Sequence, residues 1–203
     1  MNTRELLRAE RAELIALLRS LSDEEWLAPS LCAGWRVRDV VGHLLYDAIA
    51  APTYAGVFLR CGLSADRMNN LLADKSRALS TTQLVSRLEN SGERITRLAP
   101  RVGLSDMLVH QQDIRRPLGR TRQIPEDRLR SVLSHPDPFA GPGRYTRGLR
   151  FAATDLDWST GSGPEVRGPG EALAMAMVGR SAALDDLDGA GVSVLRQRMS
   201  TPA

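Results

Sequence analysis

The stretch that decides the fold lies between residues 34 and 45 and reads Gly34-Trp35-Arg36-Val37-Arg38-Asp39-Val40-Val41-Gly42-His43-Leu44-Leu45. Its apolar residues recur every three or four positions, so we expect a helix that starts near Arg36, runs towards Ala50 and buries one face. We expect Pro52 to end or kink this helix, because proline lacks the N–H that the helix needs. His43 falls within the apolar stripe, where an imidazole without a polar partner would be costly.

A second stretch offers groups that could meet this histidine: Ser105-Asp106-Met107-Leu108-Val109-His110-Gln111-Gln112-Asp113. Asp106 and His110 are four positions apart, so on a helix they project from one face. Together with His43 they would supply two imidazoles and one carboxylate, a set that binds Zn²⁺ or a similar divalent metal and leaves a coordination position open. The same residues are also expected if His43 is a core histidine with an ordinary hydrogen bond and Asp106 and His110 form a surface pair. The spacing alone does not decide between these interpretations.

The rest of the first two thirds of the chain is also typical of helices. Asn2 and Glu5 have the spacing of a capping box, and the leucines that follow predict a first helix ending near Leu21. The same apolar period predicts four further helices, over residues 64–80, 82–98, 104–115 and 126–133.

The composition changes at His135, where a loop rich in proline and glycine follows at residues 136–143. Beyond it, Leu149, Phe151 and Ala153 alternate with polar residues as in a strand, residues 165–167 suggest a returning strand, and residues 171–180 and 192–199 suggest helices. We therefore expect a mainly α protein with a helical bundle over residues 1–135 and a small α/β region over residues 145–203.

Composition and charge narrow the classes of partner. The 203 residues can bury a core without disulfides, and the net charge of +3 comes from interleaved acidic and basic residues. The one short basic cluster, around Arg115 and Arg116, has no stacking aromatic beside it, which argues against nucleic-acid binding. Cys32 and Cys61 form no CxxC pair, and the charged N-terminus lacks an apolar segment, so we expect reduced thiols, no signal peptide, no membrane span and a cytoplasmic location.

Both histidine-containing stretches resemble the metal motifs of the mycothiol-dependent maleylpyruvate isomerase family, whose bundle is DinB-like. Residues 153–158, Ala-Thr-Asp-Leu-Asp-Trp, and residues 163–168, Gly-Pro-Glu-Val-Arg-Gly, are similar to the C-terminal part of many such proteins. The resemblance covers nearly the whole chain and implies an up-and-down four-helix bundle with a metal between its helices. By position, His43, Asp106 and His110 match the family's three ligands, although the isomerase itself has Glu where this chain has Asp106.

The resemblance also implies an activity and a cofactor. The family uses mycothiol, and a metal that lowers the pKa of a bound thiol favours attack on an electrophilic carbon, as in an isomerase or an S-transferase. Arg115 and Arg116 are candidates to bind a carboxylate of the substrate or cofactor, or are cations that complement the helix dipole. Asp113 could orient an imidazole or pair with these arginines.

Three hypotheses about the function remain open from the sequence. The chain is a thiol-using metalloenzyme acting on a small electrophile, a metal-binding bundle with a sensing or stress-response role, or an interaction protein whose histidines have no ligand. A homodimer is possible, because helical bundles often pair through one face. Zn²⁺ is the expected metal, although other divalent ions tolerate the same nitrogen and oxygen donors.

Overall fold

The computed structural model describes residues 1–200, apart from the side chain of Asp66. The fold is mainly helical with a small three-stranded sheet near the C-terminus, which confirms the expected fold class. Contacts divide the chain into an N-terminal unit, Asn2–Thr121, and a C-terminal unit that begins at Arg122. This division differs from the expected boundary at residues 136–144, because the helix over residues 126–134 packs against a later helix of the C-terminal unit.

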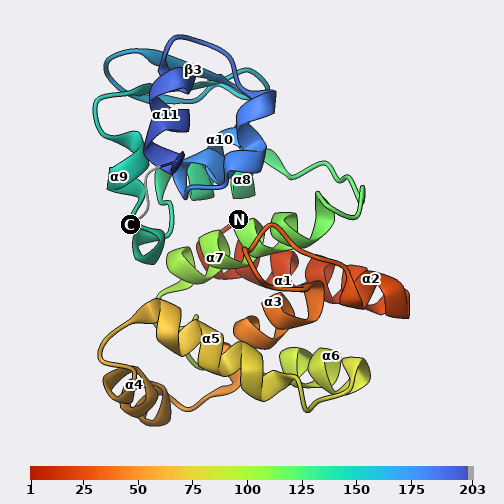
Figure 1. Ribbon diagram of the computed structural model, residues 1–203. Coiled ribbons are helices and arrows are strands. Elements are labelled where there is room, and N and C mark those ends of the chain that lie inside the picture. Colours follow the sequence, from red (N-terminus) through yellow and green to blue (C-terminus); the bar gives the residue numbers. More distant parts are fainter. Residues whose placement is uncertain (201–203) are drawn as a thin grey trace. The chain divides into compact units, whose positions relative to one another are not determined.

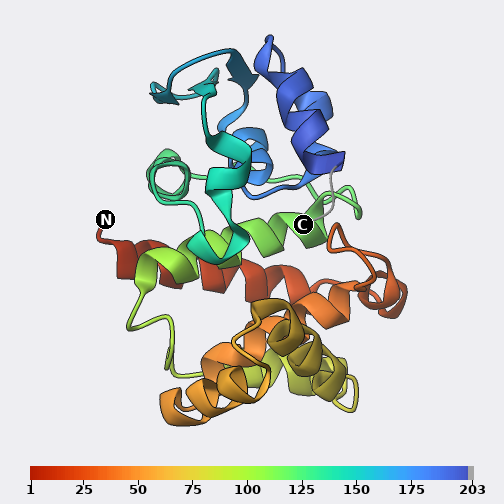
Figure 2. The same ribbon diagram turned by 60° about the vertical axis from the view of Figure 1, so that its left-hand side comes forward.

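The N-terminal unit is built from helices. They are α1 (Thr3–Arg19), α2 (Asp23–Leu27), α3 (Val37–Leu44) with the 3₁₀ turn η1 (Leu45–Ala48), α4 (Ala51–Arg60), α5 (Ala65–Ser76), α6 (Thr81–Glu89) and α7 (Pro100–Arg115). α7 lies along α1 in both ribbon views (Figures 1 and 2), and α3 packs against α5. Within residues 1–200, no helix is both long and apolar enough to cross a membrane.

α1 and α7 run in the same direction. Gly103 lies beside Leu7 near the start of both helices, and Gln111 donates a hydrogen bond to Glu10 further along, over 3.1 Å. The facing apolar side chains are almost completely buried, among them Leu7, Leu14, Leu104 and Leu108. These contacts fix which face of α7 is turned towards the core.

The helices expected over residues 36–50 and 82–98 end early, and one helix was not expected. The helix that carries His43 is α-helical only to Leu44, and Pro52 is the second residue of a helix that we did not expect, α4. Proline suits this place because the first N–H groups of a helix have no intrahelical partner. The helix expected over residues 82–98 ends at Glu89, because Gly92 and Glu93 take the left-handed conformation, with φ of 72° and 50°.

The close approach of α3 to α5 depends on a glycine. A Cβ at Gly42 would overlap the side chain of Ser76 and would lie 2.5 Å from its Cβ. Because Gly42 directly precedes His43, this contact also sets where the imidazole enters the core.

We expect Gly42→Ala to reduce the free energy of unfolding by about 1–3 kcal/mol through overpacking. Gly56→Ala is the matched control, since Gly56 also lies in a helix but a Cβ there would have no neighbour within 4 Å. The control should be stabilising by roughly 0.5–1 kcal/mol, because alanine favours the helix. Urea denaturation of both variants measures the difference, and equal effects would contradict the steric argument.

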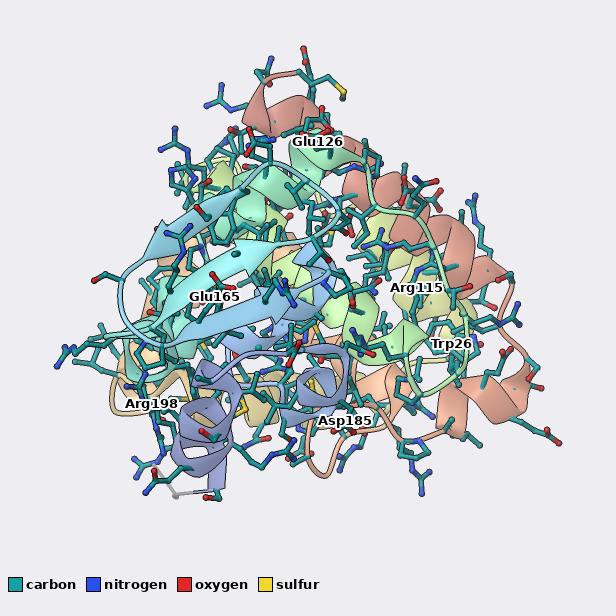
Figure 3. The ribbon with its side chains drawn as sticks, turned by 90° about the horizontal axis from the view of Figure 1, so that it is seen from above. Trp26, Arg115, Glu126, Glu165, Asp185 and Arg198 are labelled. Atoms are coloured by element: carbon teal, nitrogen blue, oxygen red, sulfur yellow. The ribbon has the colours of Figure 1, made fainter. Side chains whose placement is uncertain are left out.

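The C-terminal unit combines helices with a short sheet. Its elements are α8 (Glu126–Ser134), η2 (Pro138–Ala140), α9 (Pro142–Thr146), β1 (Arg150–Ala153), β2 (Ser159–Gly161), β3 (Glu165–Gly168), α10 (Gly170–Met177), η3 (Ser181–Asp186) and α11 (Gly191–Ser200). β1 is central and pairs antiparallel with β2 and parallel with β3, where Phe151 lies opposite Val166. Figure 3 looks onto this sheet and labels Glu165, the first residue of β3.

Candidate metal site

Two helices of the N-terminal unit bring His43, Asp106 and His110 together. α3 carries His43 and α7 carries the other two, one helical turn apart. Asp106 Oδ1 lies 3.6 Å from His43 Nε2 and 3.3 Å from His110 Nε2. The side chains of the three residues are 6%, 13% and 12% exposed, so the cluster is shielded from solvent on most sides.

The spacing of these atoms suits a metal ion. A tetrahedral ion with bonds of about 2.0–2.2 Å needs neighbouring ligand atoms about 3.3–3.6 Å apart. The two measured distances to Asp106 Oδ1 fall in that range, and one donor atom from each residue lies within 4.8 Å of the others. Two imidazoles and one carboxylate also match the donors that zinc and other borderline divalent ions accept.

A tyrosine fixes the carboxylate of this cluster. Tyr46, three positions after His43, donates a hydrogen bond from its hydroxyl to Asp106 Oδ2 over 3.0 Å. Burial, together with the Asp106 charge, raises the pKa of the Tyr46 hydroxyl well above its usual value, so this group remains a donor. Oδ2 is therefore engaged, and Oδ1 is the oxygen that faces both imidazoles.

A second carboxylate holds the other side of His110. His110 Nδ1 lies 2.9 Å from Asp113 Oδ2, and the Asp113 side chain is completely buried. With the proton on Nδ1, the imidazole turns its Nε2 lone pair towards Asp106 and His43, as in many metal sites whose histidine is oriented by a carboxylate. Asp113 is thus placed to orient the imidazole, and its buried carboxylate contacts His110.

The charges in the cluster shift both titrating groups. Burial alone would raise the pKa of the Asp106 carboxyl, but the neighbouring His110 and His43 hold that pKa well below its usual range. Burial would likewise lower the pKa of His110, yet the neighbouring Cys32 and Asp106, and hydrogen bonds to Asp106 and Asp113, raise it well above its usual value. The cluster therefore favours positive charge beside an ionised carboxylate, which is the charge pattern that a bound cation would also satisfy.

The loop before α3 adds a thiol to the same cluster. Cys32 Sγ lies 3.6 Å from His110 Nδ1 and 3.1 Å from Asp113 Oδ2. No local pattern in the sequence predicts this contact, because Cys32 and His110 are 78 positions apart. Tyr46 was also missed, although its position three residues after His43 places it on the same side of a helical turn.

Trp35 lies beside this centre, and the two predicted arginines lie further along α7. The Trp35 ring is 5.7 Å from the His43 ring, and its Nε1 donates to Asn70 Oδ1 over 3.0 Å. Arg115, labelled in Figure 3, is the last residue of α7, and Arg116 caps that helix. Both are half-buried, about 8–9 Å along the helix axis from His110. A role in binding a carboxylate stays a prediction for them.

Comparison with known proteins agrees with this architecture. Residues 7–103 match the family model described as the mycothiol maleylpyruvate isomerase N-terminal domain, a range that includes His43 and ends before Asp106. No curated protein matches significantly.

Solved structures extend the likeness to most of the chain. Two crystal structures of the mycothiol-dependent maleylpyruvate isomerase, one of them a histidine-to-alanine mutant, are similar, each with a TM-score of 0.64 and 15% identity. The match covers 93% of this chain and 91% of theirs, and at this identity it shows a common fold. The match to this family therefore rests on residues 7–103, which correspond to its N-terminal domain.

Proposed function

We propose that this protein is a divalent-metal-dependent enzyme of the isomerase or S-transferase type that uses mycothiol and acts on a small electrophilic substrate. The observation that carries the proposal is the convergence of His43, Asp106 and His110 at distances that suit one tetrahedral ion. The match of residues 7–103 to that family's N-terminal domain supports the thiol cofactor, since the similar crystal structures are of a mycothiol-dependent enzyme.

In this proposal the three side chains hold the cation, and Zn²⁺ is the first candidate. A bound divalent ion at this place would lower the pKa of a coordinated thiol, so that the nucleophilic thiolate is available near neutral pH. Three protein ligands leave a fourth position open, as catalytic zinc sites require. The thiolate would then attack an electrophilic carbon of the substrate.

The surrounding residues prepare the ligands for this role. Asp113 orients His110 through Nδ1, and Tyr46 holds Asp106 so that one carboxylate oxygen faces the two imidazoles. Burial of all three ligands excludes most of the water that would compete for them. Arg115 and Arg116, near the end of α7, are proposed to bind a carboxylate of the substrate or the cofactor.

Metal analysis of the purified protein tests the site. The wild-type chain should bind one divalent ion, and His43→Ala or Asp106→Ala should remove most of it, because each removes one of three protein ligands. His135→Ala is the control: His135 is the remaining histidine, is exposed and lies in the C-terminal unit. If both ligand variants keep the wild-type metal content, the assignment of His43 and Asp106 as metal ligands is wrong.

The activity is tested by a thiol-conjugation and isomerisation screen of small electrophiles. We expect turnover that needs both mycothiol and the metal and that the His43→Ala variant lacks. Turnover that persists after verified metal removal would contradict metal dependence. A protein that binds metal but shows no metal-dependent turnover across the screen would instead be a binding protein.

A further inference from the structure

Cys32 is placed against α7 by a well-defined loop. Ser30 Oγ accepts a hydrogen bond from the Cys32 N–H over 3.1 Å, and the Trp35 N–H donates to the Cys32 carbonyl over 2.9 Å. The Leu31 N–H donates to the Asp113 carbonyl over 3.0 Å, which ties the loop to the helix next to the site. Gly34 closes the turn with a φ of 77°. The backbone hydrogen bonds of this loop therefore place the Cys32 side chain next to His110, in addition to any effect of its rotamer.

The three side chains at this point offer one sulfur, one nitrogen and one oxygen donor. One donor atom each from Cys32, His110 and Asp113 lies within 4.8 Å of the others. For a tetrahedral ion with a sulfur bond of about 2.3 Å and a nitrogen bond of about 2.0–2.1 Å, the two donors are about 3.6 Å apart. The measured distance from Cys32 Sγ to His110 Nδ1 is 3.6 Å. The shorter distances to Asp113 Oδ2, 3.1 and 2.9 Å, are those of hydrogen bonds, so the carboxylate would withdraw by a few tenths of an ångström as the ion displaced the protons.

This cluster is distinct from the site described above, although the two share His110. The first site uses the Nε2 atom of His110 and this one uses its Nδ1 atom. A neutral imidazole has one lone pair: a cation at Nε2 leaves the proton on Nδ1 for Asp113, and a cation at Nδ1 leaves the proton on Nε2 for Asp106. Only one of the two sites can therefore be filled while the ring is neutral.

We propose that Cys32, His110 and Asp113 form a second cation site, selective for thiophilic divalent ions such as Cd²⁺, that competes with the His43–Asp106–His110 site for His110. Thiolate is the donor that soft metals prefer, whereas imidazole together with carboxylate also suits less thiophilic divalent ions such as Fe²⁺ and Ni²⁺. Cys32 is half-buried, so an ion can reach it from solvent. The softness of the ion therefore decides which of the two sites it occupies. When the occupied site changes, the proton of the His110 imidazole moves from one ring nitrogen to the other.

Titration with CdCl₂, followed by ultraviolet absorption and by the metal content after desalting, tests this proposal. The wild-type protein should bind one Cd²⁺ and show a sulfur-to-cadmium charge-transfer band. Cys32→Ser should lose the band while still binding one Cd²⁺ at the first site. Cys61→Ser is the matched control, because Cys61 is also half-buried but belongs to the end of α4, and it should keep the band.

A variant of the first site separates this proposal from the proposed enzyme. His43→Ala should keep the cadmium band, since His43 is not a ligand of the second site; Asp106→Asn serves the same purpose if His43→Ala does not fold. The absence of a band in the wild-type protein, or its survival in Cys32→Ser, would overturn the second site. Two tightly bound Cd²⁺ ions per chain would overturn the competition. None of these outcomes depends on the enzyme having activity.

Discussion

Replacing Asp47 by alanine is expected to destabilise the N-terminal unit by about 3–5 kcal/mol, because it leaves a buried arginine without its counter-charge. Arg11 of α1 forms an ion pair with Asp47, and the two side chains are only 8% and 1% exposed. Asp47 Oδ1 also accepts the backbone N–H groups of Ile95 and Thr96 over 2.9 and 2.8 Å, and Oδ2 accepts the Thr96 hydroxyl over 2.9 Å. One carboxylate thus holds η1, α1 and the turn before α7 together.

Urea denaturation followed by tryptophan fluorescence measures this loss most directly in a Trp158→Phe background. The two remaining tryptophans, Trp26 and Trp35, both belong to the N-terminal unit, so the signal reports that unit alone. Glu89→Ala is the matched control: it removes an ion pair with Arg19 in which both side chains are substantially exposed, and should cost only about 0–1 kcal/mol. A loss for Asp47→Ala no larger than that of the control would show that the buried pair is not a major support.

The sequence predicted the parts of the fold that depend on local patterns. The capping box of Asn2 and Glu5 is present at the start of α1, and the apolar period of residues 37–44 does produce a buried helix. In contrast, the turn that replaces the last part of the helix expected over residues 82–98 is held by Asp47, whose carboxylate accepts the N–H groups of Ile95 and Thr96. An interaction between residues almost fifty positions apart leaves no local pattern in the sequence.

The candidate site was likewise predictable only where it depends on a local pattern. The four-residue spacing of Asp106 and His110 indicated a shared face, and the structure places both on one face of α7, with His43 opposite them. That they bind a metal stays a prediction. Cys32 could not be placed beforehand, because its approach to His110 depends on the loop that joins α2 to α3 and on the hydrogen bond between Leu31 and Asp113. Spacing therefore identified the donors within one helix, and only the packing of separate segments identified the full cluster.

Removal of the bound metal is expected to lower the stability of the same unit. An ion that binds the folded chain but not the unfolded chain stabilises the fold by RT ln(1 + [L]/Kd). This is about 2.7 kcal/mol when the free ion is at 100 times its Kd. The ligands come from α3 and α7, which lie far apart in the sequence, so the unfolded chain does not present them together. Urea denaturation in the Trp158→Phe background, with the ion at that concentration and again after chelation, should show this loss.

The His43→Ala variant supplies the internal control for this measurement. It lacks one ligand of the site, so the chelator should change its stability by much less than it changes that of the parent chain. An equal effect in both proteins would assign the stabilisation to another binding place, with the Cys32 cluster as the first candidate because His43 does not belong to it. Adding Cys32→Ser to His43→Ala then distinguishes the two sites: if the chelator effect disappears, the metal was held by the thiol. An effect that survives in the double variant would contradict both sites, since each would have lost a ligand.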